Sequence, residues 1–296
     1  MRPGLRLVGA TALIWAVVAA LFLTSVAGIA HRAEGAGGFF GPKVALVELE
    51  GIILDADELV RELKAHRENP IVRAVVIRIN SPGGVVGPTQ ELHQAIVKTR
   101  QAGKPVVASL GGVAASGGYY VAVAADQIYA NPGTLTGSIG VIMQTANVEQ
   151  LMKKVGVDFV VVKAGDYKDI GSFARPMTAE ERRVLQALLD DVHGQFIGAV
   201  AQGRKLDRAR VTQFADGRIF SGSQAKSLGM VDALGGLEDA VAAAGKLAGL
   251  PGTPVVLPPR RKISIMDLLR NQFGGAATGM IRPGLPIFRT PLYLMD

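Results

Sequence analysis

Two glycine-rich segments of the sequence contain residue types that could cleave a peptide bond. Hydrolysis through an acyl-enzyme needs a nucleophile, a base that takes its proton, and donors for the developing oxyanion. In residues 111–120, Ser116 stands between glycines that permit a tight turn and close approach of a substrate. A helix beginning there would leave the Gly117 N–H free to donate to the oxyanion. Ser116 is therefore a candidate nucleophile, although a serine in this setting is more often a helix cap.

The segment Asn-Ser-Pro-Gly-Gly at residues 80–84 could supply a second oxyanion donor. It follows an apolar, β-branched run, and the N–H of Gly83 would lie at this strand-to-helix turn. Taken alone, such a segment is an ordinary tight turn. Its position one strand before the Ser116 segment makes the pair more informative than either alone.

The base that would activate Ser116 is less obvious. His193 is the histidine that follows Ser116 in the chain, and it reads as a surface or boundary residue of a helix. The alternative is Lys168, which follows an apolar segment at 159–162 that predicts a strand. A lysine acts as a base near neutral pH when burial removes its hydration. Asp166 and Asp169 would favour the charged ammonium, so this hypothesis requires both carboxylates to point elsewhere.

Alternating strands and helices must position these loops. The pattern predicts strands at 43–50, 74–79 and 106–110, with helices at 57–67 and after residue 84. Such alternation is typical of an α/β fold with a largely parallel sheet, in which chemistry lies at the loops that follow the strands.

A longer helix is predicted farther along the chain. Thr178 and Glu181 form a capping box, and an apolar face then continues to Gly203. We expect linker at 32–42, the catalytic domain at 43–250, and a basic, proline-containing tail at 251–296.

The first residues predict membrane attachment. Residues 7–30 carry no charge over 24 positions and follow Arg2 and Arg6, which favours a transmembrane helix with a cytoplasmic N-terminus. A cleaved secretory signal remains open, because residues 25–27 form a small-x-small site. Either interpretation places the domain outside the cytoplasm, with membrane lipid as a partner of an uncleaved helix.

Composition excludes several other functions. The 296 residues include no cysteine, so disulfides and thiolate zinc sites are impossible. Most of the net charge of +7 is terminal, because residues 31–259 hold 24 basic and 23 acidic side chains. A nearly neutral domain argues against nucleic acid as a partner. We expect no cofactor and no metal site.

Several motifs in one order resemble the signal peptide peptidase A family of membrane serine proteases, over roughly residues 43–247. The shared segments are INSPGG at 79–84, ASGGYY at 115–120, TGSIGV at 136–141, GDYKD at 165–169, DGRIFSG at 216–222 and QAKSLGMVD at 224–232. The resemblance implies a fold of the Clp protease/crotonase type, preceded here by one N-terminal transmembrane helix.

The resemblance also implies roles for individual residues. Ser116 matches the nucleophile of the family, Lys168 its general base, and Ser138 a serine whose hydroxyl holds the lysine amine. Gly83 and Gly117 match the backbone donors of the oxyanion hole. It further implies remnant signal peptides as substrates and a homo-oligomer, in which two arrangements of the lysine stay open: it acts within its own chain or across a subunit interface.

Three alternatives stay open at this stage. A membrane serine protease of the NfeD type shares the Ser and Lys dyad, but its chains usually continue into further membrane spans, and no second uncharged run of that length follows residue 31. A crotonase-like acyl-CoA enzyme would normally be cytoplasmic. A membrane scaffold that keeps the fold without proteolysis is the third.

Overall fold

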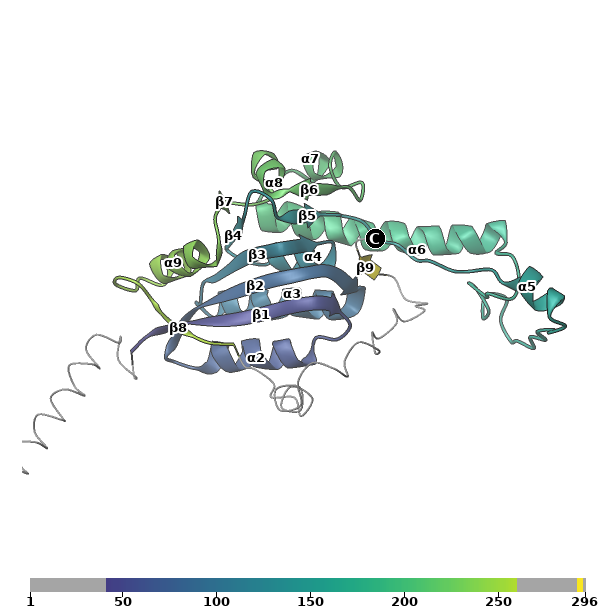
Figure 1. Ribbon diagram of the computed structural model, residues 1–296, viewed down its shortest axis with the longest axis horizontal. Coiled ribbons are helices and arrows are strands. Elements are labelled where there is room, and N and C mark those ends of the chain that lie inside the picture. Colours follow the sequence, from purple (N-terminus) through teal and green to yellow (C-terminus); the bar gives the residue numbers. More distant parts are fainter. Residues whose placement is uncertain (1–40, 260–291, 295–296) are drawn as a thin grey trace, which may run out of the picture.

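The computed structural model describes residues 41–259 and 292–294, and a mostly parallel sheet organises them (Figure 1). The strands are β1 (Lys43–Ile53), β2 (Val72–Val85), β3 (Val106–Ala115), β4 (Gln127–Ala130), β5 (Leu135–Gly137), β6 (Ile219–Ser221), β7 (Ala233–Leu234), β8 (Val255–Leu257) and β9 (Leu292–Leu294). The helices are α2 (Asp57–Glu68), α3 (Val86–Gln101), α4 (Gly117–Ala122), α5 (Glu149–Lys154), α6 (Ala179–Arg204), α7 (Arg208–Thr212), α8 (Gly222–Leu228) and α9 (Leu237–Leu247).

The strand order places the two glycine-rich loops at one edge of the sheet. The order is β6-β5-β3-β2-β1-β8, with β4 beside both β3 and β7, and β9 beside β2. Every described pairing is parallel except β2 with β9 and β5 with β6. Since the carboxyl ends of β2 and β3 are neighbours, the segments that follow or finish these strands come together.

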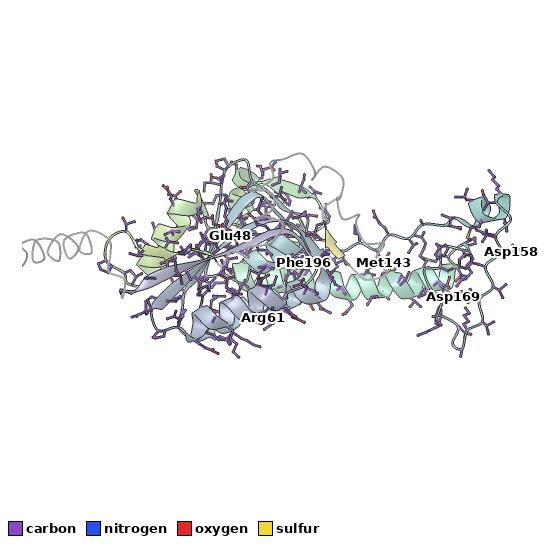
Figure 2. The ribbon with its side chains drawn as sticks, turned by 60° about the horizontal axis from the view of Figure 1, so that its bottom comes forward. Glu48, Arg61, Met143, Asp158, Asp169 and Phe196 are labelled. Carbon is purple, nitrogen blue, oxygen red and sulfur yellow. The ribbon has the colours of Figure 1, made fainter. Side chains whose placement is uncertain are left out.

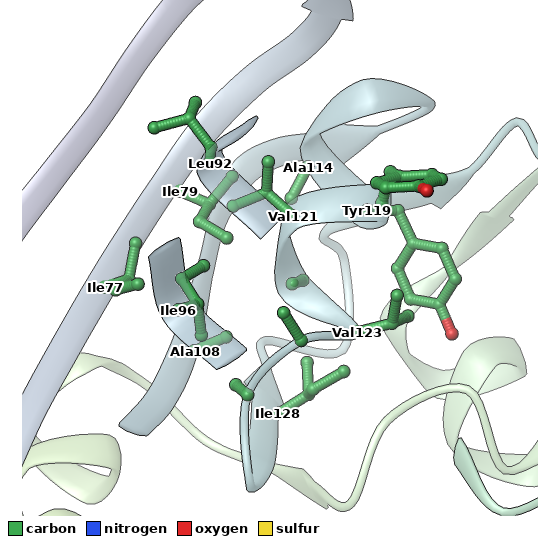
Figure 3. Packing of buried hydrophobic residues seen from close by; sticks show 14 of the residues in the cluster. Ile77, Ile79, Leu92, Ile96, Ala108, Ala114, Tyr119, Val121, Val123 and Ile128 are labelled. Atoms are coloured by element: carbon green, nitrogen blue, oxygen red, sulfur yellow. The ribbon is translucent and has the colours of Figure 1, made fainter. Parts of the chain in front are cut away.

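Helices cover both faces of the sheet, because alternate residues of each central strand point to opposite sides. Along β2, Val75 and Ile77 belong to the core beneath α2, α3, α4 and α6, whereas Ala74 and Val76 pack with α9 on the other face. Figure 3 shows Leu92 and Ile96 of α3 within the larger core, close to the strand residues. This burial fixes the strands from which the candidate site extends.

An arm projects from this body. It comprises residues 142–178, includes α5, and runs beside the N-terminal half of α6 (Figures 1 and 2). With 26 residues, α6 is about 39 Å long at 1.5 Å per residue. Phe196, in its C-terminal half, is buried in the core, whereas Asp158 and Asp169 lie out on the arm in Figure 2.

Most expected elements are present. The predicted strands correspond to β1, β2 and β3, the helix at 57–67 corresponds to α2, and the capping box of Thr178 and Glu181 opens α6. The strand predicted at 159–162 is wrong: these residues form no strand, and their apolar side chains are exposed. No described neighbour offers them a backbone ladder, and a strand without a partner has no hydrogen bonds to stabilise it.

Two features concern the ends of the chain. Strands β8 and β9 lie beyond residue 250, within the segment expected to be a tail, and both join the sheet. The expected transmembrane helix at 7–30 and all but the last two residues of the linker expected at 32–42 lie outside the described residues. Across 41–259 and 292–294, no helix combines the length and the apolar character needed to cross a membrane.

Candidate active site

Ser116 lies at the junction between β3 and α4, in an unusual backbone conformation. Its φ is 52° and its ψ is −118°, values that a residue with a side chain rarely adopts. The side chain is fully buried, and its hydroxyl has no hydrogen-bond partner among the described residues. Buried polar atoms are normally paired, and backbone strain tends to occur at functional sites. Both observations single out Ser116.

Ser138 lies beside Ser116 through its own backbone. The N–H of Ser116 donates to the carbonyl of Gly137 at 2.8 Å, and Ser138 is the next residue. Ser138 also has a positive φ, of 49°, and its N–H donates to the Arg218 carbonyl at 2.8 Å. Strand β5 therefore brings the second predicted serine next to the first.

The two predicted oxyanion donors also lie together. A Cβ built on Gly117 would come within 3.1 Å of the Gly83 Cα and 3.0 Å of the Thr89 Oγ1. Gly83 has a φ of 106°, a conformation that favours glycine. Its N–H is engaged, because it donates to the buried hydroxyl of Ser81 at 3.1 Å. Ser81 is thus a contact of the site that the sequence pattern did not single out, although it lies within the motif.

The backbone of β2 at this point accepts a partner in extended conformation. Strand β9 pairs antiparallel with it, aligning Leu294 with Gly83, Tyr293 with Gly84 and Leu292 with Val85. The edge beside the candidate oxyanion donors can therefore bind an extended segment by backbone hydrogen bonds.

Lys168 is not brought to Ser116 within one chain. It is exposed, and it lies on the arm next to Asp169, which Figure 2 labels far from the body. Among the described residues its ammonium makes no hydrogen bond or ion pair, and the unpartnered Ser116 hydroxyl excludes contact between the two. The predicted site residues therefore form a group of four, comprising Gly83, Ser116, Gly117 and Ser138, from which Lys168 is absent.

The histidines do not replace Lys168 in this structure. His193 is half-buried, and its Nε2 lies 3.1 Å from the Ile139 carbonyl, as expected for a boundary residue. His93 packs against the ring of Tyr120, and burial, followed by the charge of Arg100, lowers its pKa to about 4. Neither ring forms a hydrogen bond with the Ser116 hydroxyl.

The described body also has surface pockets that do not include Ser116 among their lining residues. One pocket of about 880 Å³ opens between α2, α3 and α6, with Lys64, Gln90 and Tyr120 among its lining residues. Ser116 does not line it. A site for an extended peptide does not require a deep pocket, because such a peptide is bound along a strand edge.

Comparison with known proteins identifies the family of the chain. The sequence model of peptidase family S49 matches residues 98–251, which include both Ser116 and Lys168. This chain belongs to peptidase family S49. The S49 assignment makes it a serine peptidase, and the resemblance of its motifs to signal peptide peptidase A agrees with that assignment.

Three relatives extend the comparison. A candidate protease of Synechocystis sp. is 48% identical over 217 residues, covering 73% of this chain and 78% of the relative. A candidate signal peptide peptidase SppA of Enterococcus faecium is 34% identical, over 69% of this chain and 63% of its own length. The chloroplastic serine protease SPPA of Arabidopsis thaliana is 33% identical, over 79% of this chain and 34% of its own. The chain thus spans only part of the longer relatives.

Proposed function

We propose that this S49 peptidase is an endopeptidase of the signal peptide peptidase A type that uses Ser116 as nucleophile and Lys168 as general base. The observation that carries the proposal is the Ser116 hydroxyl: buried, unpartnered and held at a strained turn beside Gly83 and Gly117. A packing serine has no need of such strain.

The reaction follows the acyl-enzyme route. The neutral amine of Lys168 takes the proton of Ser116 Oγ as this oxygen attacks the peptide carbonyl, and the carbonyl π electrons move to the oxygen. The N–H groups of Gly117 and Gly83 stabilise that oxyanion, the second by exchanging its bond to Ser81. Collapse of the intermediate breaks the C–N bond, and the lysine returns the proton to the leaving amine. Water, deprotonated by the same lysine, then releases the acyl group.

The base comes from a neighbouring copy of the chain. Lys168 is carried on an arm that leaves the body, and that arm exposes a run of apolar side chains around it. Val160 is 86% exposed and Val162 is 96% exposed. Burial of such apolar side chains would lower the free energy of the protein, and an exposed apolar patch is typical of an interaction surface. In an oligomer, each arm would pack against the body of the neighbouring subunit. This contact would bury these residues, remove water from Lys168 and bring Lys168 close to Ser116 of that subunit. In that assembly the Ser138 hydroxyl orients the amine.

The substrates are remnant signal peptides. An apolar peptide without a fold of its own can lie along residues 83–85 of β2 in place of β9, which occupies these positions in the structure. The name of the Enterococcus faecium relative favours the same substrate class. We place the domain outside the cytoplasm, attached to the membrane by residues 7–30, where such peptides are left after preprotein cleavage.

The test is cleavage of a synthetic signal peptide by the full chain in detergent. Wild-type protein should cleave it and leave a folded control protein intact, whereas Ser116→Ala and Lys168→Ala should each lose nearly all activity. Activity that persists in either variant would refute the dyad. A wild-type protein that is folded and oligomeric but cleaves no peptide would favour the non-proteolytic scaffold.

A further inference from the structure

Near Lys168, four charged side chains of the arm and α6 form an ionic cluster that the packing of the body does not explain. They are Lys163, Asp169, Arg175 and Glu181. The guanidinium of Arg175 contacts two carboxylates at once: its Nε donates to Asp169 Oδ2 at 2.9 Å, and its two terminal nitrogens donate to the two oxygens of Glu181. The side chain of Lys163 donates to Asp169 Oδ1 at 2.5 Å. The cluster therefore joins the loop that carries Lys168 to the first turn of α6.

This cluster is better shielded than an ordinary surface ion pair. The side chain of Glu181 is 5% exposed and that of Asp169 is 14% exposed. Glu181 is also the capping-box residue of α6, accepting from the Thr178 N–H at 2.8 Å. A planar guanidinium suits this arrangement because it presents several donors in fixed directions, which a lysine ammonium does not.

Both carboxylate oxygens of Asp169 thus accept hydrogen bonds from Lys163 and Arg175, and neither is bonded to the adjacent Lys168. No hydrogen bond or ion pair joins Asp169 to Lys168 in the part of the chain that the structure describes. Backbone turns surround the two residues, with Lys168 N–H donating to the Gly165 carbonyl and Ser172 N–H to the Asp169 carbonyl. This satisfies, for Asp169, the condition that its carboxylate point away from the candidate base.

We propose that Arg175 is a positioning residue for the reaction: it fixes the Lys168 loop to α6 and, together with Lys163, keeps the Asp169 carboxylate from pairing with the Lys168 amine. The inference rests on the proposed function, because it assigns Arg175 a role in keeping that base uncharged. A carboxylate that turned toward the amine would favour its protonated form and remove the base at neutral pH.

The charges around Asp169 are consistent with this role. Arg175 and then Lys163, by hydrogen bonding, hold the pKa of the Asp169 carboxyl well below its usual range. On the far side of the cluster, Glu181 from α6 balances Arg175, and its own pKa is lowered chiefly by Arg175. Loss of Arg175 would leave Asp169 ionised with a single remaining cation, Lys163, and free to swing toward Lys168.

The experiment compares Arg175→Gln, Arg175→Lys, Asp169→Asn and the double variant Arg175→Gln/Asp169→Asn in the full-length oligomer. In Arg175→Gln we expect the rise of kcat with pH to move about one unit to higher pH, a loss of about tenfold at neutral pH, with KM little changed. The double variant should return the rise to its wild-type position, because the displaced carboxylate is gone. Arg175→Lys should fall between Arg175→Gln and wild type.

A matched control is Asp166→Asn, since the Asp166 carboxylate takes no part in the cluster; adding it to Arg175→Gln should not restore the profile. A purely structural role predicts instead that the double variant, which has lost more contacts, is worse than Arg175→Gln, and that result would overturn the proposal.

A second readout is independent of catalysis. Acetylation of Lys168 by acetic anhydride, followed by mass spectrometry across a pH series, reports when the amine becomes neutral. Its onset should move to higher pH in Arg175→Gln and back in the double variant, and an unchanged onset would overturn the proposal. Full activity in Lys168→Ala would overturn the proposed function instead, whatever the Arg175 variants show in labelling.

Discussion

Two serines with positive φ lie side by side at the centre of this molecule, which is more strain than the packing of a sheet requires. Each such residue costs about 1–3 kcal/mol and persists only when its surroundings hold it. Backbone hydrogen bonds stabilise both conformations here: the Ser116 N–H donates to the Gly137 carbonyl, and the Ser138 N–H donates to the Arg218 carbonyl. A backbone held in this way restricts the direction of the Ser116 side chain, as the proposed role of nucleophile requires.

Adding a single carbon atom at Gly117 tests whether the close approach of Gly117 to Gly83 is needed for activity. In Gly117→Ala, the new Cβ would lie about 3.0–3.1 Å from the Thr89 Oγ1, the Gly83 Cα and the Gly84 nitrogen. The two segments that carry the oxyanion donors would have to separate, so we expect kcat for peptide cleavage to fall by about 10²–10³-fold. Steady-state kinetics with a signal peptide measure this.

Gly112→Ala is the matched control for that change. It lies five residues earlier, in β3, is exposed, and its Cβ would meet only Asn80 Oδ1, at 3.7 Å. Its kcat should stay within about twofold of wild type. Equal losses in the two variants would show that any added side chain in the segment 111–120, rather than the approach of Gly117 to Gly83, limits activity.

Among the elements, the body was predictable from the sequence and the arm was not. β-Branched runs that end in glycine-rich turns predict neighbouring parallel strands, and strand ends at one edge bring Gly83 and Ser116 together. The apolar run at 159–162 gives the same signal as a strand, but a strand also needs a partner, and the chain's own described residues provide none. Sequence periodicity cannot distinguish a partner within the chain from one in another copy, so the pattern did not predict an arm that carries Lys168 away from Ser116. The family resemblance alone allowed for a lysine that acts across a subunit interface. Arg175 was missed because its two carboxylate partners lie six residues away on either side.

The junction between the arm and α6 should weaken in acid before the sheet does. Asp169 and Glu181 both have depressed pKa values, so the stability that they contribute is complete above their ordinary values of 3.8 and 4.5 and is lost as the pH falls through their lower folded values. Hydrogen exchange measured on a pH series from 4.5 downward should show arm amides losing protection while amides of β1, β2 and β3 keep theirs. Simultaneous loss in both regions would mean that the cluster does not stabilise the arm separately.

For the whole molecule, one chain provides an incomplete set of catalytic groups and an unburied apolar surface on the same arm. The body holds the proposed nucleophile, Ser116, without a base beside its hydroxyl, and the arm carries the proposed base, Lys168, away from it. In a head-to-tail arrangement of copies, each arm would contact the body of the next copy. This single interface would both bury the apolar surface of the arm and bring Lys168 to Ser116. Such an interface closes into a ring when its rotation allows.

Mixing two inactive variants decides whether the site is shared. Ser116→Ala subunits retain Lys168, and Lys168→Ala subunits retain Ser116, so an interface between them rebuilds an intact dyad. Random exchange at equal amounts should place an intact pair at about a quarter of the sites, and peptide cleavage should recover to about that fraction of wild type. Each variant alone, and a mixture kept from exchanging subunits by chemical cross-linking beforehand, should stay inactive. If Lys168 served Ser116 of its own chain through a movement of the arm, every mixed site would still lack one of the two groups, and mixing would restore nothing.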